Sequence, residues 1–183
     1  MGWIKTNFEG VWVFEPKIWD DHRGYFVETF NASGLPQELK DLNFVQDNEA
    51  KSTRGVLRGL HYQLPPKAQA KLVRCVSGEI LDVIVDIRPG SDTFGKYLSV
   101  ILNEINKKQL FIPHGFAHGY VVLSDTAIFA YKCDQYYAPP TEGGIVYNDP
   151  RLNINWLLPL NSLIVSEKDL VLPLFSAHTP FIK

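Results

Sequence analysis

Residues 79–88 read EILDVIVDIR, in which aliphatic residues alternate with residues of mixed character. Successive side chains of a β-strand point to opposite faces, so alternate positions share a face. One face is expected to be buried in a core, and it carries Leu81, Val83, Val85 and Ile87. The opposite face carries Ile80, Asp82, Ile84, Asp86 and Arg88. We interpret this second face as a solvated outer surface; a polar-lined cavity is the alternative.

Short apolar and aromatic runs of the same kind fill most of the chain, separated by Gly, Pro, Asn or Asp. They lie at residues 11–16, 24–30, 43–50, 56–63, 71–76, 96–102, 109–113, 119–124 and 127–134. Many short strands at near-regular spacing predict a mainly β barrel or sandwich. Two short helices are also expected, at 33–42 capped by Ser33 and at 166–172 capped by Ser166 with Asp169 as its capping partner. A length of 183 residues fits a single domain, 1–183.

The charge balance argues against several kinds of partner. Lys and Arg total 18, Asp and Glu total 20, and the formal net charge is −2. No global positive field is therefore expected to hold a nucleic acid or an anionic membrane. No apolar run is long enough to cross a bilayer, and the N-terminus lacks a signal peptide. With Cys75 and Cys133 expected to be buried free thiols, we predict a cytoplasmic protein.

Two segments concentrate the candidate chemistry, RGLHYQ (58–63) and IPHGFAHGY (112–120). The pattern Pro113-x-Gly115-x-x-His118 resembles the second signature of the cupin superfamily, which implies a jelly-roll barrel. The first cupin signature supplies two His ligands to a metal, but here it reads His61-Tyr62-Gln63. A neutral amide in place of the second imidazole weakens such a site. We therefore expect no bound metal, and a His61 that is free for acid–base chemistry.

Cations lie close to His61 in the predicted sheet. Arg58 precedes it by three residues, and Lys71 and Arg74 lie on the next predicted strand. A lone strand histidine is ordinarily structural, and a lone strand lysine is ordinarily solvated. Several cations beside one histidine instead indicate a pocket for an anionic substrate.

Long stretches of the chain resemble the dTDP-4-dehydrorhamnose 3,5-epimerase family, from about residue 8 to 173. They are DDHRGYFVETF (20–30), NFVQDNEAKSTRGVLRGLHYQ (43–63), AKLVRCVSGEILDVIVDIR (70–88), FIPHGFAHGYVVLSD (111–125), FAYKCDQYYAPPTEGGIVYNDP (129–150) and SEKDLVLP (166–173). The resemblance implies an isomerase of dTDP-L-rhamnose biosynthesis. It would convert dTDP-4-dehydro-6-deoxy-D-glucose to dTDP-4-dehydro-L-rhamnose by inverting C3 and C5, without metal or other cofactor. It also implies a homodimer with exchanged N-terminal strands.

Catalytic roles follow from the resemblance, residue by residue. His61 matches the family's base, and Asp169 matches the carboxylate that orients it. A histidine titrates near neutrality and is suited to removing a carbon-bound proton. Lys71 matches the residue that faces the C4 oxygen, where a cation stabilises the enolate. Tyr131 matches the acid that returns a proton from the opposite side.

The resemblance also implies a set of substrate-binding positions. They are Arg23, Glu28, Gln46, Asp47, Asn48, Arg58, Lys71, His118, Tyr137, Glu142 and Lys168. Arg23 and Arg58 suit a diphosphate, since guanidinium groups bind phosphate through forked donors. Gln46 and Asn48 can read a pyrimidine edge, and Tyr136 and Tyr137 can stack on the base. Lys168 stands where many family members carry Arg, which makes phosphate recognition less directional.

Three other functions stay open. Inversion at C3 alone or at C5 alone would leave the same residues in place, because the shape of the pocket decides which carbon is presented. A metal-dependent cupin oxygenase would lose its activity on chelation. A non-catalytic nucleotide-sugar-binding module would bind without exchanging substrate protons with solvent, but such a module has no need for a base, an acid and an oxyanion donor together.

Overall fold

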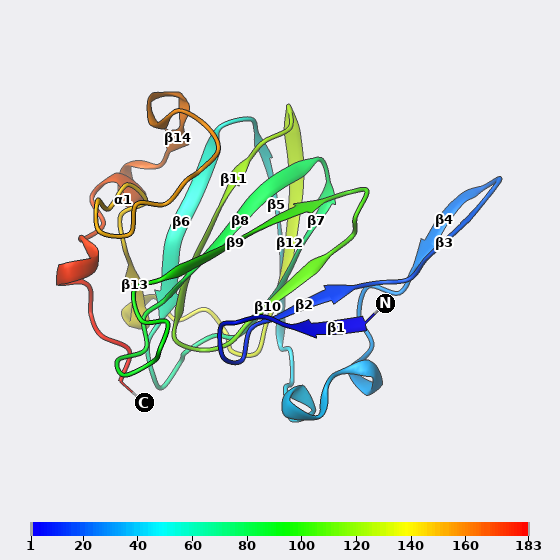
Figure 1. Cartoon of the computed structure of the whole chain (residues 1–183), viewed down its shortest axis with the longest axis horizontal. Helices are drawn as coiled ribbons and strands as arrows, with labels where there is room; N and C mark the ends of the chain where they lie inside the picture. Colours follow the sequence, from blue (N-terminus) through cyan, green and yellow to red (C-terminus); the bar gives the residue numbers. More distant parts are fainter. Residues whose placement is uncertain (1, 183) are drawn as a thin grey trace.

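The computed structural model describes residues 2–182 and contains two facing β-sheets (Figure 1). The first sheet runs in the spatial order β1 (Gly2–Lys5), β2 (Trp12–Glu15), β10 (Gln109–Ile112), β7 (Lys71–Ser77), β12 (Thr126–Cys133) and β5 (Gln46–Thr53). The second runs β13 (Glu142–Gly144), β6 (Val56–Gln63), β11 (Phe116–Val122), β8 (Glu79–Asp86) and β9 (Tyr97–Asn103). A short strand, β14 (Ile164–Val165), pairs with β6 in parallel. The predicted mainly β jelly-roll barrel is confirmed.

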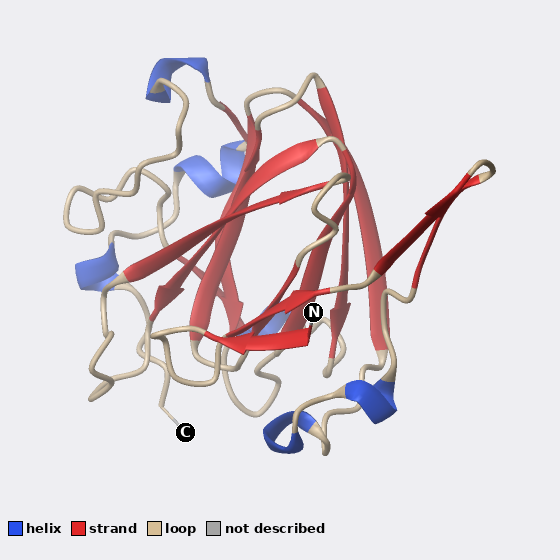
Figure 2. Ribbon diagram, turned by 45° about the vertical axis from the view of Figure 1, so that its right-hand side comes forward, coloured by secondary structure: helices blue, strands red, loops and turns tan. Residues whose placement is uncertain are grey.

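Helical segments are short and lie at the periphery (Figure 2). Within residues 2–182, the one α-helix is the single turn α1 (Glu167–Leu170). The 3₁₀ turns are η1 (Ala32–Gly34), η2 (Gln37–Leu39), η3 (Pro139–Thr141), η4 (Leu160–Ser162) and η5 (Phe175–Ala177). No helix within residues 2–182 is long and apolar enough to cross a membrane.

The predicted helix at 33–42 is wrong. That segment holds the separate turns η1 and η2, and the cap of η1 is Asn31 rather than Ser33. Leu35, between the turns, is extended with ψ 146°. The residue before a proline is pushed out of the helical region, so Pro36 prevents one continuous helix. The predicted tail helix is confirmed, with Ser166 as its cap, although it ends at Leu170.

The interpretation of residues 79–88 is half wrong. Leu81, Val83, Val85 and Ile87 pack into a core against the C-terminal segment, which contributes Trp156 and Phe175. The opposite face does not meet solvent, because it lines the space between the two sheets. Ile80 and Ile84 join the core there, and Asp82 is fully buried. The alternation identifies two faces correctly, but both faces of β8 are covered.

A two-stranded hairpin, β3 (Ile18–Asp21) and β4 (Gly24–Val27), projects away from the barrel at the upper right of Figure 1. Its large side chains Trp19, Tyr25 and Phe26 are exposed. Lys107 ties the hairpin to the barrel by donating a hydrogen bond to the Tyr25 hydroxyl at 2.8 Å. Cys75 and Cys133 are free and buried, as expected.

Candidate active site

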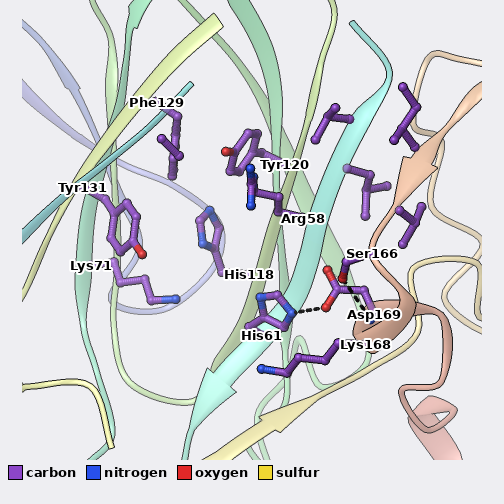
Figure 3. Close-up of a pocket in the computed structure, with 15 residues that line it drawn as sticks. Arg58, His61, Lys71, His118, Tyr120, Phe129, Tyr131, Ser166, Lys168 and Asp169 are labelled. Atoms are coloured by element: carbon purple, nitrogen blue, oxygen red, sulfur yellow. Dashed lines mark hydrogen bonds and ion pairs between the residues drawn. The ribbon is translucent and has the colours of Figure 1, made fainter. Parts of the chain in front are cut away.

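A cavity of about 540 Å³ opens between the two sheets (Figure 3). Seven of the side chains selected from the sequence line it: Arg58, His61, Lys71, His118, Tyr131, Lys168 and Asp169. They come from β6, β7, β11, β12 and α1, which are far apart in the chain. The barrel therefore brings residues of both sheets and of the tail helix around one space.

His61 on β6 forms a close pair with Asp169 on α1. His61 Nε2 lies 2.7 Å from Asp169 Oδ1, and the Gly59 amide donates to Asp169 Oδ2 at 3.2 Å. Burial alone would raise the pKa of the Asp169 carboxyl, but the contacts with His61 and Gly59 hold it below its ordinary value. An ionised carboxylate only accepts hydrogen bonds, so the ring proton of neutral His61 lies on Nε2. Nδ1 is then the basic nitrogen.

A β-bulge in β6 places Arg58 and His61 on the same wall. His61 lies opposite His118 and Arg58 opposite Tyr120, so three steps along β6 match two steps along β11. Strict alternation would have put Arg58 and His61 on opposite faces. The bulge contains Gly59, at φ +135°, where a Cβ would lie 2.5 Å from the Gly119 Cα. Only glycine fits this position.

Asp169 reaches His61 because the tail of the chain is docked on β6. In β14, Ile164 pairs with Val56 and Val165 with Leu57. Ser166 follows directly and caps α1, accepting a hydrogen bond from the Asp169 amide at 3.2 Å. The expected capping pair is thus half confirmed, since the Asp169 carboxylate turns to His61 and Gly59. A helix of one turn has little stability of its own, so its position depends on these contacts.

The wall opposite His61 carries Lys71 on β7 and Tyr131 on β12. The Lys71 ammonium lies 5.9 Å from the centre of the Tyr131 ring. Among residues 2–182, Lys71 has no hydrogen bond or ion pair through its side chain, and burial lowers its pKa. Burial raises the pKa of the Tyr131 phenol, so this side chain holds its proton at neutral pH. The cavity thus presents a base on one sheet, and a cation and a neutral acid on the other.

His118 lies beside His61 and forms a second pair with a carboxylate. Its Nε2 is 2.9 Å from Asp82 Oδ2, and the two side chains are 7% and 0% exposed. Burial lowers the pKa of His118 in spite of Asp82, and the nearby Lys71 and His61 add to this effect. The ring therefore favours its neutral form.

A chain of polar contacts starts at Lys168, which lines the cavity. Lys168 donates to Glu142 Oε2 at 2.6 Å, and the Tyr137 hydroxyl donates to the same oxygen at 2.9 Å. The Tyr137 amide donates to Gln46 Oε1 at 2.9 Å, and Gln46 Nε2 donates to Asn48 at 3.1 Å. The structure thus joins five of the predicted substrate-binding residues in one network.

Eight residues selected from the sequence do not line this cavity. Four of them, Gln46, Asn48, Tyr137 and Glu142, join Lys168 in the network above, and the other four are Arg23, Glu28, Asp47 and Tyr136. Arg23 pairs with Asp21 at 2.6 Å in the projecting hairpin, and Glu28 accepts from Asn31 at 3.2 Å. Asp47 faces the outside of the first sheet and pairs with Lys132 at 2.6 Å. Tyr136 is exposed. Their part in ligand binding stays a prediction.

Gln63, which replaces a metal-binding histidine of the cupin signature, supports nearby loops. Its side-chain amide donates to Lys67 O at 2.6 Å, and its oxygen accepts from the Ala138 amide at 2.8 Å. Within residues 2–182, no three His, Cys, Asp or Glu side chains are grouped so that they could hold a metal ion.

Sequence reasoning missed four residues at the site: Asp82, Tyr120, Phe129 and Ser166. A signal existed for two of them. Tyr120 and Phe129 lie two residues from His118 and Tyr131, so strand alternation puts each on the same face as its partner. Asp82 was assigned to a solvated surface, and Ser166 was regarded only as a helix cap.

Comparisons with known proteins identify the family and the structural relatives of this chain. Residues 5–177 match the family model described as dTDP-4-dehydrorhamnose 3,5-epimerase. A protein of that name from Shigella flexneri is 52% identical over 171 residues, covering 93% of each chain. The crystal structure of dTDP-6-deoxy-D-glucose-3,5-epimerase from Legionella pneumophila in complex with dTDP-4-keto-L-rhamnose is 46% identical. It has a TM-score of 0.92 and covers 100% of this chain and 98% of its own.

A more distant structure is a 3′-monoepimerase from Streptomyces bikiniensis in complex with dTDP-quinovose. It is 35% identical with a TM-score of 0.88, and the match covers 96% of this chain and 88% of that one. Proteins described as inverting one centre and proteins described as inverting two therefore share this fold.

Proposed function

This chain belongs to the dTDP-4-dehydrorhamnose 3,5-epimerase family and is an isomerase, and we propose that its barrel cavity inverts C3 and C5 of dTDP-4-dehydro-6-deoxy-D-glucose. The product is dTDP-4-dehydro-L-rhamnose, for dTDP-L-rhamnose biosynthesis. Both carbons flank the C4 ketone, so loss of either proton gives an enolate whose charge lies on the C4 oxygen.

His61 Nδ1 takes the proton from carbon, and the C–H electron pair moves into the enolate. Asp169 stabilises the resulting imidazolium through Nε2. The Lys71 ammonium, which has no hydrogen bond or ion pair within residues 2–182, stabilises the enolate oxygen. Tyr131 donates its phenolic proton to the opposite face of the same carbon, and proton exchange with solvent resets His61 and Tyr131. Two such cycles invert two centres.

The observation that carries this proposal is the placement of the base and the acid on opposite walls. His61 lies on β6 of one sheet, whereas Tyr131 and Lys71 lie on β12 and β7 of the other (Figure 3). Inversion requires removal of a proton from one face and delivery to the other. A site that only bound a nucleotide sugar would have no need of this arrangement.

The test is incubation with dTDP-4-dehydro-6-deoxy-D-glucose in D₂O, followed by NMR of the sugar. Deuterium at both C3 and C5 together with the L-rhamno product is the expected result. Deuterium at one carbon alone would replace the proposal with a single-centre epimerase. Deuterium at neither carbon, with the nucleotide sugar still bound, would indicate a binding protein.

The active molecule is a homodimer in which the β3–β4 hairpin reaches the partner subunit. This proposal is supported by the exposed Trp19, Tyr25 and Phe26, since an apolar patch on a projecting ribbon suits a protein surface. Arg23 and Glu28 lie on or beside this hairpin and would then complete the partner's site. Light scattering of an active sample should give twice the 20.8 kDa of one chain, and an active monomer would overturn the proposal.

The reaction proceeds without a metal, and the enzyme works in the cytoplasm. The first statement is supported by the use of His61 Nε2 and Gln63 in contacts with the protein itself. The second is supported by the two free cysteines. Activity should survive dialysis against EDTA, and cell fractionation should recover the protein with the cytosol. If EDTA abolished the activity and only added metal restored it, the metal-free reaction would be contradicted and a metal-dependent cupin site would be favoured.

A further inference from the structure

The pair His118–Asp82 is more deeply buried than the pair His61–Asp169, and its function is not explained by the proton transfers above. His118 on β11 and Asp82 on β8 come from adjacent strands of one sheet. Phe129 stacks on the His118 ring from the facing sheet, with the ring centres 6.0 Å apart. Asp82 Oδ1 is buried and has no hydrogen-bond partner within residues 2–182. The ring is thus held by a neighbouring strand and by an aromatic wall.

The chemistry of this pair fixes the position of the ring proton. A carboxylate has no proton to donate, so the contact with Asp82 requires the hydrogen on His118 Nε2. Burial disfavours a second proton on the ring. Nδ1 is then an unprotonated nitrogen with a free lone pair, and it has no protein partner within the described chain.

The other polar groups around His118 are mainly donors. Arg58 and Lys71 carry only N–H donors, and the Tyr120 hydroxyl is buried without a completed hydrogen bond. These groups suit the oxygens of a ligand. A hydroxyl group also has a proton to donate, and that proton needs an acceptor. His118 Nδ1 is such an acceptor within the cavity.

We propose that Asp82 is a positioning residue that locks His118 as a hydrogen-bond acceptor, and that His118 Nδ1 selects substrates by accepting from a hydroxyl of the hexose. The inference rests on the proposed function for the identity of the ligand as a hydroxylated sugar. A sugar that lacks this hydroxyl, or carries an ether there, leaves a buried acceptor unpaired and binds more weakly.

The first test reads the tautomer directly, by NMR of the intact protein labelled with ¹⁵N-histidine. At neutral pH we expect His118 to be neutral with its proton on Nε2. Asp82→Asn should change this state, because an amide can donate to Nε2 and drive the proton to Nδ1. Asp169→Asn is the matched control, since it should alter the His61 signals and leave those of His118. A wild-type His118 that is doubly protonated, or protonated on Nδ1, would overturn the proposal.

The second test measures selection with ligands that cannot react. dTDP-6-deoxy-D-glucose lacks the ketone, and its 2-deoxy and 3-deoxy forms each lack one hydroxyl. We expect wild-type protein to bind one of the deoxy forms about 10-fold more weakly than the parent, the loss expected for one hydrogen bond. Asp82→Asn should bind the parent about 10-fold more weakly and should no longer distinguish that deoxy form. Equal discrimination in wild type and Asp82→Asn would overturn the role of Asp82.

These measurements need no turnover, so they separate the two proposals. Suppose that Asp82→Asn no longer distinguishes the deoxy ligand from its parent, and that wild-type protein incorporates no deuterium from D₂O. That result would contradict the proposed epimerisation and support the role of Asp82 in positioning His118. If wild-type protein epimerises the substrate normally and Asp82→Asn still distinguishes the deoxy ligand from its parent, only the role of Asp82 would be contradicted.

Discussion

The two histidine–aspartate pairs of the cavity are alike in composition and differ in surroundings. The contact distances are 2.7 Å for His61–Asp169 and 2.9 Å for His118–Asp82. The side chains of the first pair are 29% and 5% exposed, and those of the second are 7% and 0% exposed. The His61 ring is the more exposed of the two, whereas burial lowers the pKa of the His118 ring and favours its neutral form. The two pairs have the same residue types, so the difference in burial is what makes His61 suited to act as a base and His118 suited to act as a hydrogen-bond acceptor.

The largest expected difference lies between the two histidines. His61→Asn removes the base and should lower kcat by roughly 10³- to 10⁴-fold, near the upper end of what general bases contribute. His118→Asn should act mainly on KM, by about 10-fold, because it removes one contact to the sugar. Steady-state kinetics and deuterium incorporation check both variants. Equal losses of kcat would mean that both rings take part in proton transfer.

Lys71 lies on β7, on the wall opposite both histidines. Lys71→Met should lower kcat by roughly 10²- to 10³-fold, the usual loss on removing an oxyanion donor. Burial lowers the pKa of Lys71, so activity should fall on the alkaline side as this group loses its charge. The variant should lack that alkaline decline in a pH–rate profile. Retention of the decline would assign it to another group.

The same variant sharpens the comparison of the histidines. The positive charge of Lys71 helps to keep the pKa of His118 low. We therefore expect that pKa to rise in Lys71→Met, while the proton of the neutral ring stays on Nε2. A ¹⁵N NMR titration measures both properties. A neutral ring that changes tautomer in this variant would show that Asp82 alone does not fix it.

Tyr131→Phe tests whether the two walls act separately. The variant keeps the ring but loses the proton donor, so net inversion should fall by roughly 10²-fold, the lower end of what general acids contribute. Deuterium exchange with retained configuration should fall less, because His61 can still remove a proton and return another. The ratio of exchange to inversion, followed by NMR in D₂O, should rise. An unchanged ratio would assign proton delivery to a group other than Tyr131, such as a water molecule.

Ser166→Ala is expected to give the smallest effect. Loss of this cap loosens α1, and a lost N-cap commonly costs about 1 kcal/mol of helix stability. If that loss is felt at Asp169, kcat should fall by roughly 5-fold with little change in KM. Ser166→Thr keeps a capping hydroxyl and serves as the control. A larger change in KM than in kcat would indicate that Ser166 contacts the substrate.

Much of the fold could be predicted because short alternating strands leave a clear pattern. The pattern of residues 79–88 nevertheless misled, since a polar residue on an alternating strand is compatible both with solvent and with a polar cavity. The position of β8 between β11 and β9, with the other sheet facing it, shows that the polar face of this strand lies in the interior. Local rules also had limits, because Pro36 divides a segment whose composition favoured a helix.

The site was less accessible to residue-level reasoning than the fold. Asp169 is 108 residues from His61, and no periodicity connects them, so only the family resemblance indicated their pairing. The common wall of Arg58 and His61 depends on a bulge that interrupts the alternation on which the prediction relied. Asp82 was missed because a polar residue on an alternating strand was assigned to a solvated surface.

The bulge at Gly59 has a consequence for how this barrel can diverge. Any side chain at position 59 would press on the backbone of Gly119, so a change on one strand demands a compensating change on its neighbour. Loss of the extra residue would turn either the guanidinium or the imidazole out of the cavity. Residues of the tail can therefore be replaced one at a time during evolution, whereas a change at Gly59 requires a matching change at Gly119 on the neighbouring strand.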